Sequence, residues 1–304
     1  MEERKVKISN LIMYGMGDFF GGGSFLIIGM LYLFFLTEVV GLTPVLASAV
    51  FAIGKVWDAV SDPLMGYISD NTRSKLGRRR IYLLIGITPI ALSFILMWLP
   101  VGFGSTIALF FYYSFAYILF STVFTMVMVP YAALNAEMTT DYKVRTRMSG
   151  VRIVFSQFSA LLAGTLPKII INQFTPEQQT TGYLIMAVVF GVLYATPWIF
   201  VFLGTWELPY KKNKIKKHSP LAIFSNFGSI FKNKSFRIHI AMYICAYSAM
   251  DILMAMFAYY LTYYLDRPEL YSVAMGALLI TQMAMLAVYV IVANKKGKGF
   301  AYIM

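Results

Sequence analysis

The stretch of sequence that decides the fold is KVWDAVSDPLMGYISDNTRSKLGRRR, which runs from Lys55 to Arg80. It begins inside an apolar run and ends in one of the densest basic clusters of the chain. Lys55, Asp58 and Asp62 lie in the apolar part, where a charged side chain costs about 2.5–3.5 kcal/mol on membrane-insertion scales. Such residues are expected to face a cavity or a partner, which makes them candidates for function.

The composition is that of a membrane protein. Of the 304 residues, 59% are hydrophobic and 13% are charged, and the mean hydropathy is +0.68. Soluble domains carry roughly 25% charged residues. The only cysteine, Cys245, cannot form an intramolecular disulfide, and two histidines without cysteine partners argue against a zinc site. We therefore expect no resident metal and no cofactor beyond a transported ion.

The hydrophobic runs predict an all-α integral membrane protein. A spanning helix needs about 20 mostly apolar residues. Eight runs meet this length, and a ninth begins at the final FAYIM. The expected fold is thus about eight complete transmembrane helices plus the start of a ninth. The eight runs cover residues 11–37, 44–68, 81–100, 106–135, 148–171, 182–206, 237–264 and 272–293.

The basic residues predict the orientation in the membrane. The chain has 26 Lys and Arg residues, and 23 of them lie in or beside alternate connections between the runs. The exceptions are Lys55, Lys168 and Arg267. We assign Lys168 and Arg267 to the opposite loops. This distribution places the N-terminus and the connection 207–236 in the cytoplasm. It also explains the net charge of +12 without a nucleic-acid partner. The polar N-terminus is not typical of a cleaved signal peptide.

The connection 207–236 divides the chain. We expect a six-helix bundle over residues 1–206, a basic cytoplasmic linker over 207–236 and the start of a second bundle over 237–304. The basic linker is expected to lie against anionic lipid headgroups, with a partner-protein site as the alternative. Six helices, a basic linker and further helices is the layout of a transporter built from two parallel repeats.

Lys55, Asp58 and Asp62 are spaced by three and four residues, so they share one face of a helix. Two carboxylates this close repel each other unless one is protonated or a cation lies between them. The pattern favours a site for a small cation or a proton, with Lys55 offsetting part of the negative charge. The alternative is a structural ion pair between Lys55 and Asp58, with Asp62 reaching interfacial water.

Other polar residues lie in or near the runs. Asp18 either faces a central substrate cavity or accepts hydrogen bonds near the cytoplasmic end of the first helix. Arg152 and Gln157 are candidate donors to an oxygen-rich ligand, although Arg152 also fits a cytoplasmic anchor. Asp251 either serves the cavity from the second half or pairs with a neighbouring helix.

The Lys55–Arg80 stretch resembles the second helix and following loop of the glycoside–pentoside–hexuronide:cation symporters, a branch of the major facilitator superfamily that includes the melibiose carrier. Further matches are YGMGDFF at 14–20, FLTEVVGL at 35–42 and VPYAALNAEMTTDYKVRTRMSGVR at 129–152. Asp-x3-Asp-Pro followed by NTRSKLGRRR is specific to the family, whereas the Gly66-x3-Asp70 loop is shared across the superfamily.

The resemblance implies uptake of a sugar or glycoside together with Na⁺ or H⁺, by alternating access and without enzymatic chemistry. It implies the cation site at Asp58 and Asp62, with Lys55 as the preceding basic residue, and it places Arg152 in the sugar pocket. A monomer in the cell membrane is expected. The cytoplasmic gate loop would contain Gly66, Asp70, Arg73, Gly77, Arg78 and Arg79, with Asp70 and the basic residues contacting the second half.

The chain also departs from the family pattern. Gly22 stands where the melibiose carrier has a sugar-binding aspartate, Thr122 stands near the position of a second one, and Met126 near an aromatic partner. These differences argue against galactoside recognition by that route and leave another sugar, a uronide or a non-sugar solute open. The chain is also shorter than the family's twelve helices, so we expect a truncated carrier that transports poorly by itself.

Two further readings remain open at this stage. A cation-coupled carrier of lysolipid or another non-sugar solute on the same fold is the main alternative, because Met-rich and aromatic stretches permit an apolar cavity. A membrane sensor would leave the paired aspartates without a task. A membrane enzyme is disfavoured, because the spans contain no constellation of nucleophile and base.

Overall fold

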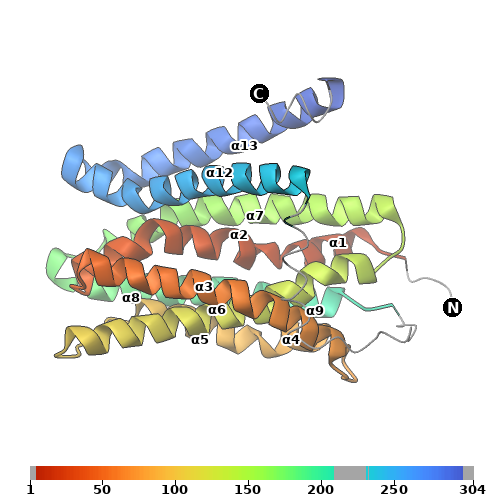
Figure 1. Ribbon diagram of the computed structural model, residues 1–304, viewed down its shortest axis with the longest axis horizontal. Coiled ribbons are helices and arrows are strands. Elements are labelled where there is room, and N and C mark those ends of the chain that lie inside the picture. Colours follow the sequence, from red (N-terminus) through yellow and green to blue (C-terminus); the bar gives the residue numbers. More distant parts are fainter. Residues whose placement is uncertain (1–4, 209–230, 232, 297–304) are drawn as a thin grey trace.

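The computed structural model describes residues 5–208, 231 and 233–296. These residues form a bundle of long helices that run roughly side by side (Figure 1). The expected linker 207–236 and the start of a ninth helix lie almost entirely outside the described residues. The α-helices are α1 (Ile8–Gly15), α2 (Asp18–Ile27), α3 (Pro44–Asn71), α4 (Arg80–Ile85), α5 (Ile87–Trp98), α6 (Thr106–Glu137), α7 (Tyr142–Ile171), α8 (Gln179–Ala195), α9 (Pro197–Gly204), α12 (Lys234–Tyr259) and α13 (Tyr271–Lys296).

Short segments of tighter or wider helix complete the described chain. Two π-helical turns extend the first helix beyond α2, and a third continues α12. Two single 3₁₀ turns occupy the connections before α8 and α13. The π-helical turns are η1 (Ile28–Tyr32), η2 (Phe35–Val39) and η4 (Tyr260–Tyr264), and the 3₁₀ turns are η3 (Pro176–Gln178) and η5 (Pro268–Leu270).

Six helices in the described residues are long and apolar enough to cross a membrane, fewer than the eight expected. The predicted run 81–100 is divided at Gly86 into α4 and α5, and α5 alone is too short to count. Gly86 lies where a methyl group would collide with Val127 of α6, so the break accompanies a close helix contact. The run 272–293 forms α13, which is not among the six spans.

Local sequence explains where several helices begin. The Thr43 hydroxyl accepts a hydrogen bond from the Leu46 N–H, and Pro44 occupies the first position of α3. The Asp141 carboxylate accepts hydrogen bonds from the N–H groups of Lys143 and Val144 at the start of α7. Such caps satisfy donors that a helix leaves unpaired at its first turn. The cap at Asp141 starts α7 six residues before the predicted run.

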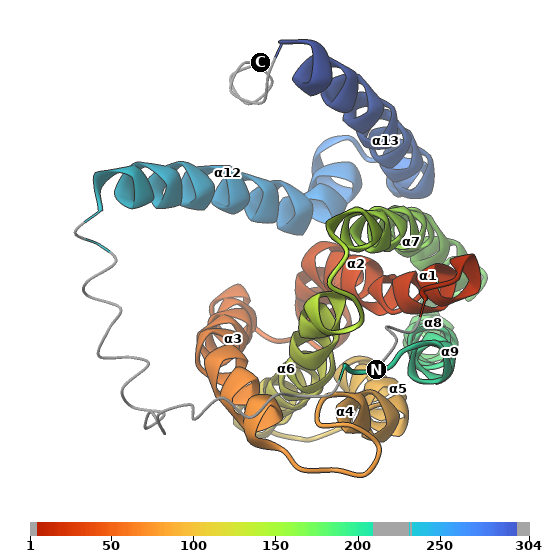
Figure 2. The same cartoon turned by 90° about the vertical axis from the view of Figure 1, so that its right-hand side faces the viewer.

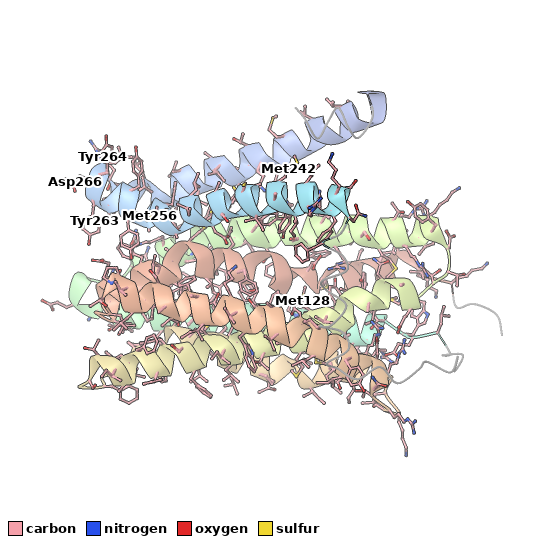
Figure 3. All side chains as sticks on the ribbon, viewed as in Figure 1. Met128, Met242, Met256, Tyr263, Tyr264 and Asp266 are labelled. Carbon is pink, nitrogen blue, oxygen red and sulfur yellow. The ribbon has the colours of Figure 1, made fainter. Side chains whose placement is uncertain are left out.

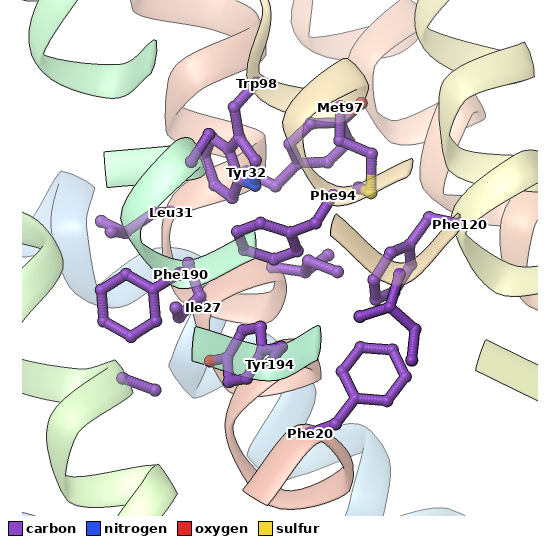
Figure 4. Packing of buried hydrophobic residues seen from close by; sticks show 14 of the residues in the cluster. Phe20, Ile27, Leu31, Tyr32, Phe94, Met97, Trp98, Phe120, Phe190 and Tyr194 are labelled. Atoms are coloured by element: carbon purple, nitrogen blue, oxygen red, sulfur yellow. The ribbon is translucent and has the colours of Figure 1, made fainter. Parts of the chain in front are cut away.

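Aromatic side chains dominate the core formed by the helices between Ile8 and Gly204. Phe20, Phe94 and Tyr194 are fully buried and contact one another or Phe120 through tilted and edge-on ring pairs (Figure 4). Edge-to-face pairs contribute about 0.5–1.5 kcal/mol beyond the burial of their area. The rings come from α2, α5, α6 and α8, so this core holds these four helices together.

Helices α12 and α13 lie along one side of the bundle (Figures 1 and 2). The first half of α12 is exposed, and its contacts with the first helix concentrate near its end, where the Tyr259 hydroxyl lies 2.6 Å from the Thr37 hydroxyl. Tyr263 donates a hydrogen bond to Glu38 at the same end, where Tyr264 and Asp266 also gather (Figure 3). The end of α12 is thus attached to the first bundle.

The position of Lys168 corrects one prediction. The sequence pattern assigned it to an outer loop, but it lies in the last turn of α7 and is only 7% exposed. Its ammonium group lies 4.9 Å from the centre of the Phe34 ring and 5.8 Å from that of Tyr271. The aliphatic stem packs in this aromatic environment while the aromatic faces attract the charge.

Candidate functional site

The candidate site lies between α3 and α6, which pack closely. A methyl group at Gly54 would overlap the ring of Tyr117, so glycine allows the two helix backbones to approach. Gly54 and Tyr117 are 63 positions apart, as are Asp58 and Ser121, and Asp62 and Thr125. The constant offset means that α3 and α6 run parallel in register, with contacts repeating every fourth residue.

This register places a hydroxyl against each of the two aspartates. Ser121 donates a hydrogen bond to the Asp58 carboxylate, and the Thr125 hydroxyl donates to Asp62 Oδ1 at 2.7 Å. Ser61 lies between them, with its hydroxyl 3.3 Å from that of Thr125. Ser121 and Thr125 were not predicted as site residues. Ser121 and Thr125 are four residues apart, as are Asp58 and Asp62, and this matching spacing in the sequence could have indicated that they pair.

Lys55 does not form the predicted alternative ion pair with Asp58. Its Nζ lies 3.8 Å from Asp251 Oδ2 on α12 and 5.8 Å from the centre of the Phe25 ring. The side chains of Lys55 and Asp251 are 56% and 69% exposed, so other described side chains do not enclose the pair. Asp251 lines a cavity and pairs with α3 through Lys55, and its role in that cavity stays a prediction.

Two cavities meet at Lys55. The smaller, of about 190 Å³, is lined by Phe25, Lys55, Asp58, Asp62 and Phe124. The larger, of about 350 Å³, lies between the first helix, α3, α6 and α12. Its walls are mostly apolar or aromatic, and its polar side chains are those of Ser48, Lys55, Tyr117 and Asp251. Lys55 and Phe25 line both cavities and therefore separate them.

Asp18 and Arg152 were both candidates for substrate binding, and the structure pairs them with each other. Arg152 donates from Nε to Asp18 Oδ2 at 2.8 Å and from Nη2 to Oδ1 at 3.0 Å. The guanidinium also lies 4.6 Å from the centre of the Tyr131 ring. The side chains are 14% and 21% exposed. A two-point pair of this kind satisfies the carboxylate and leaves its charge neutralised.

The other two predicted substrate residues lie apart from this pair. The Thr122 hydroxyl accepts a hydrogen bond from the Trp57 indole at 2.8 Å and donates to the Ile118 carbonyl. Gln157 is half-buried on α7. Gly22, which stands where the melibiose carrier has an aspartate, packs against Ser156 of α7 so closely that a methyl group would collide. The first helix is thus in close contact with α7 at this point.

The predicted gate loop is held by carboxylates of the first bundle and of the chain just after it. Arg79 donates to Asp70 at 2.5 Å and its Nε lies 3.0 Å from Glu137, which Arg78 also contacts. The Glu207 carboxylate accepts hydrogen bonds from the N–H groups of Arg78, Arg79 and Arg80.

Gly77 has φ +106°, a conformation that favours glycine and turns the loop. Arg73 is exposed and Gly66 is half-buried near the end of α3. The contact of this loop with the second half, expected from the sequence, stays a prediction.

The two aspartates and their partners on α6 bring several oxygen atoms together. Within the described part of the chain, no group of three or more His, Cys, Asp and Glu side chains is placed to hold a metal ion. Asp58 and Asp62 supply up to four carboxylate oxygens, and the hydroxyls of Ser121 and Thr125 keep free lone pairs when they donate. Such a set suits a small hard cation or a proton.

Known proteins resemble this chain over most of its length. Residues 13–304 match the family model of the MFS/sugar transport proteins. The chain is 35% identical over 198 residues to an uncharacterized symporter, sll1374, of Synechocystis sp., which covers 64% of this chain and 36% of that protein. It is 26% identical to the inner membrane symporter YicJ of Escherichia coli, over 89% of this chain and 58% of the relative.

The name of a third relative describes it as a lipid transporter. The sodium-dependent lysophosphatidylcholine symporter 1-A of Danio rerio is 28% identical over 51% of this chain and 29% of its own length. The chain thus spans between about a third and three fifths of the length of these relatives. The family match over nearly the whole chain, together with six apolar helices of spanning length, shows that the protein is a multi-pass membrane protein of the MFS/sugar transport protein family.

Proposed function

We propose that this chain contains the coupling-ion site of a cation-coupled symporter, with Na⁺ or H⁺ held by Asp58 and Asp62. The observation that carries the proposal is the pair of carboxylates on one face of α3, each bonded to a hydroxyl of α6, beside a cavity of about 190 Å³. Ionisable groups inside the membrane that border a cavity mark ion pathways in transporters. The names of the related symporters support the same activity.

Electrostatics gives the pair its selectivity for positive charge. Two neighbouring carboxylates repel, and a bound cation or proton removes the repulsion. Lys55 carries one positive charge on the same face, but its ammonium group contacts Asp251. Asp58 and Asp62 instead accept hydrogen bonds from the hydroxyl groups of Ser121 and Thr125. A hydroxyl group does not neutralise a carboxylate, so the charges of Asp58 and Asp62 would attract a cation placed between them.

The larger cavity is proposed as the substrate site, and a sugar or glycoside is its proposed occupant. Phe25, Phe51 and Tyr117 present aromatic surfaces, while Asp251 and Lys55 offer an acceptor and donors to hydroxyl groups. Its volume of about 350 Å³ falls in the range of small-molecule pockets. The description of the family as sugar transport proteins supports this class.

A lysolipid is the second candidate substrate. The cavity is lined mainly by apolar side chains, including Ile28, Leu33 and Ile252, which would accommodate an acyl chain. The likeness to a lysophosphatidylcholine symporter supports this alternative. Direct recognition by Asp18 and Arg152 would require breaking their ion pair, so they are proposed as substrate residues only for a solute that competes for that pair.

Transport is proposed to proceed by alternating access of two helix units, with the N-terminus and the loop from Gly66 to Arg79 on the cytoplasmic side. The ion pairs of Asp70 and Glu137 with Arg78 and Arg79 would hold that loop as part of the cytoplasmic gate. Cation and substrate must raise each other's affinity by the same factor, because linkage between binding sites is reciprocal. We expect a monomer to be sufficient.

Equilibrium binding tests the proposal. Labelled glycosides and labelled lysophosphatidylcholine are titrated onto the purified protein in lipid nanodiscs, with Na⁺ and pH varied separately. We expect one class of solute to bind more tightly when Na⁺ is added or the pH is lowered, and Asp58→Asn and Asp62→Asn to abolish that dependence. Glu177→Gln, an exposed carboxylate in η3, is the matched control. Cation dependence that survives both aspartate variants would exclude the assigned site.

A further inference from the structure

The two cavities share a wall, and Lys55 is its charged member. Lys55 projects from α3 one helical turn from Asp58, and residues three apart on a helix are neighbours. The same ammonium group lies 3.8 Å from Asp251 across the larger cavity. Lysine has a flexible four-carbon stem. Its ammonium therefore has two acidic partners within reach, one at the ion site and one on α12.

Asp251 occupies a distinctive position on α12. Within the described chain, the first buried residue of α12 is Met254, and the helix from Lys234 to Leu253 is exposed or half-exposed. The far end of α12 is attached through Tyr259 to Thr37 and through Tyr263 to Glu38. Asp251 thus lies at the boundary between the attached end of α12 and the part without buried contacts.

From these observations we propose that Lys55 exchanges between Asp251 and the Asp58–Asp62 pair, so that the charge of the ion site sets the distance between α3 and α12. The inference rests on the proposed function, because it requires a cation at the aspartate pair. It adds a positioning residue on each side of the cavity, Lys55 and Asp251, that connects the ion site to the helix on the opposite wall.

The direction of the exchange follows from charge. Without a bound cation the two aspartates carry excess negative charge, and the ammonium of Lys55 is drawn toward them and away from Asp251. A cation at the pair neutralises that charge and repels the ammonium, which then pairs with Asp251 and draws α12 toward α3. The 3.8 Å between Lys55 Nζ and Asp251 Oδ2 is longer than a hydrogen bond, so this contact is weak enough to exchange.

A distance measurement tests the exchange without any transport assay. Ala52 and Ala255 line the larger cavity on α3 and α12, near Lys55 and Asp251 respectively. Cysteines at these two positions, in a Cys245→Ser background, are cross-linked with a short thiol reagent in nanodiscs. The rate is measured with and without Na⁺, and at high and low pH. We expect the cation to raise the rate, because it draws α12 toward α3.

Variants separate the exchange from cation binding itself. Lys55→Met and Asp251→Asn should each remove the effect of the cation on cross-linking, and Lys55→Arg should restore part of it. Ser48→Ala, an uncharged change in the same cavity, should leave it intact. Cation binding is followed in parallel by the fluorescence of Trp57, whose indole bonds to Thr122 beside the ion site.

The outcomes distinguish the two proposals. Cation binding that persists in Asp251→Asn while the cross-linking response disappears supports the exchange. Cation binding with no cross-linking response, or a response that survives Lys55→Met and Asp251→Asn, overturns the exchange and leaves the ion site standing. Absence of any cation binding to the protein overturns both.

Discussion

The protein contains two groups of charged residues among its apolar helices, and they are treated in opposite ways. Asp18 meets Arg152 in a two-point ion pair beside aromatic rings, with side chains 14% and 21% exposed. Asp58 and Asp62 meet hydroxyl groups, and the nearby lysine contacts a third aspartate instead. The first group is neutral as a unit. The second has hydroxyl partners and lies at the edge of a cavity.

The difference shows how the partners of a carboxylate in an apolar helix indicate what the carboxylate does. A carboxylate held by an arginine has its charge and its hydrogen-bonding capacity satisfied, so its contribution is to join α2 to α7. Carboxylates held only by hydroxyls keep an attraction for a further positive charge. The position of an acidic residue in an apolar run is the same signal in both cases. We propose that the partner across the helix interface decides whether such a carboxylate mainly joins helices or can hold an ion.

The largest effect is expected from breaking the Asp18–Arg152 pair. Arg152→Met leaves the Asp18 carboxylate without its cation, and removing one partner of a buried pair costs about 3–5 kcal/mol of unfolding free energy. Unfolding in detergent mixtures measures this cost. Asp18→Asn combined with Arg152→Met should recover most of it. A loss below about 1 kcal/mol in the single variant would mean that the pair is solvated and that the comparison is false.

A smaller loss is expected from Gly22→Ala, which strains the interface beside that pair. The added methyl would collide with Ser156, and overpacking of this kind costs about 1–3 kcal/mol. Gly29→Ala is the matched control on the same helix, since a methyl there meets nothing within 4 Å. Thermal denaturation of the two variants should separate clearly. Equal melting temperatures would contradict the close α2–α7 contact.

Two threonines one helical turn apart on α6 test the role of hydroxyl groups at the Asp58–Asp62 pair. Thr125 donates to Asp62, whereas Thr122 bonds to Trp57 and to a backbone carbonyl. Thr125→Val should lower cation affinity about tenfold or more, because hydrogen bonds involving charged groups contribute about 1.5–3 kcal/mol. Thr122→Val should change it little. Cation titrations followed by Trp57 fluorescence compare the two variants. A larger loss of affinity in Thr122→Val than in Thr125→Val would mean that the cation does not bind at Asp62.

The smallest effect on stability is expected at the aspartate pair itself. Asp62→Asn removes the repulsion between neighbouring carboxylates but keeps a group that accepts the Thr125 hydrogen bond. The unfolding free energy should change by less than about 1 kcal/mol, or rise, while cation dependence is lost. Unfolding measured without Na⁺ tests this. A loss as large as that of Arg152→Met would show that the pair is structural.

Much of the site could be predicted from the sequence, because helical spacing alone places Lys55, Asp58 and Asp62 on one face. The family and the all-helical membrane fold were also predicted, and both are confirmed. The predicted number of about eight spanning helices is not confirmed: six described helices qualify by length and composition, and a hydropathy pattern does not show the break at Gly86 between α4 and α5. Lys168 was misplaced because charge patterns do not reveal aromatic neighbours from other helices.

Contacts between helices account for the rest. The pairing of Asp18 with Arg152 joins residues 134 positions apart, and that of Lys55 with Asp251 joins two helices far apart in the chain. A single sequence contains no direct record of such distances. The register of α3 with α6 is an exception in part, since the matching spacing of Asp58–Asp62 and Ser121–Thr125 is visible in the sequence.

The central claim is that Asp58 and Asp62 hold the coupling ion, and infrared difference spectroscopy of the protein in lipid tests it most directly. Difference spectra are recorded on exchange of choline for Na⁺ and, separately, on a decrease in pH, and the carboxylate bands are compared. Our account predicts a saturable shift of carboxylate bands with Na⁺, or conversion to a protonated carboxyl band with acid, that disappears in Asp58→Asn/Asp62→Asn and persists in Glu177→Gln. Identical difference spectra in the wild type and the double aspartate variant would contradict it.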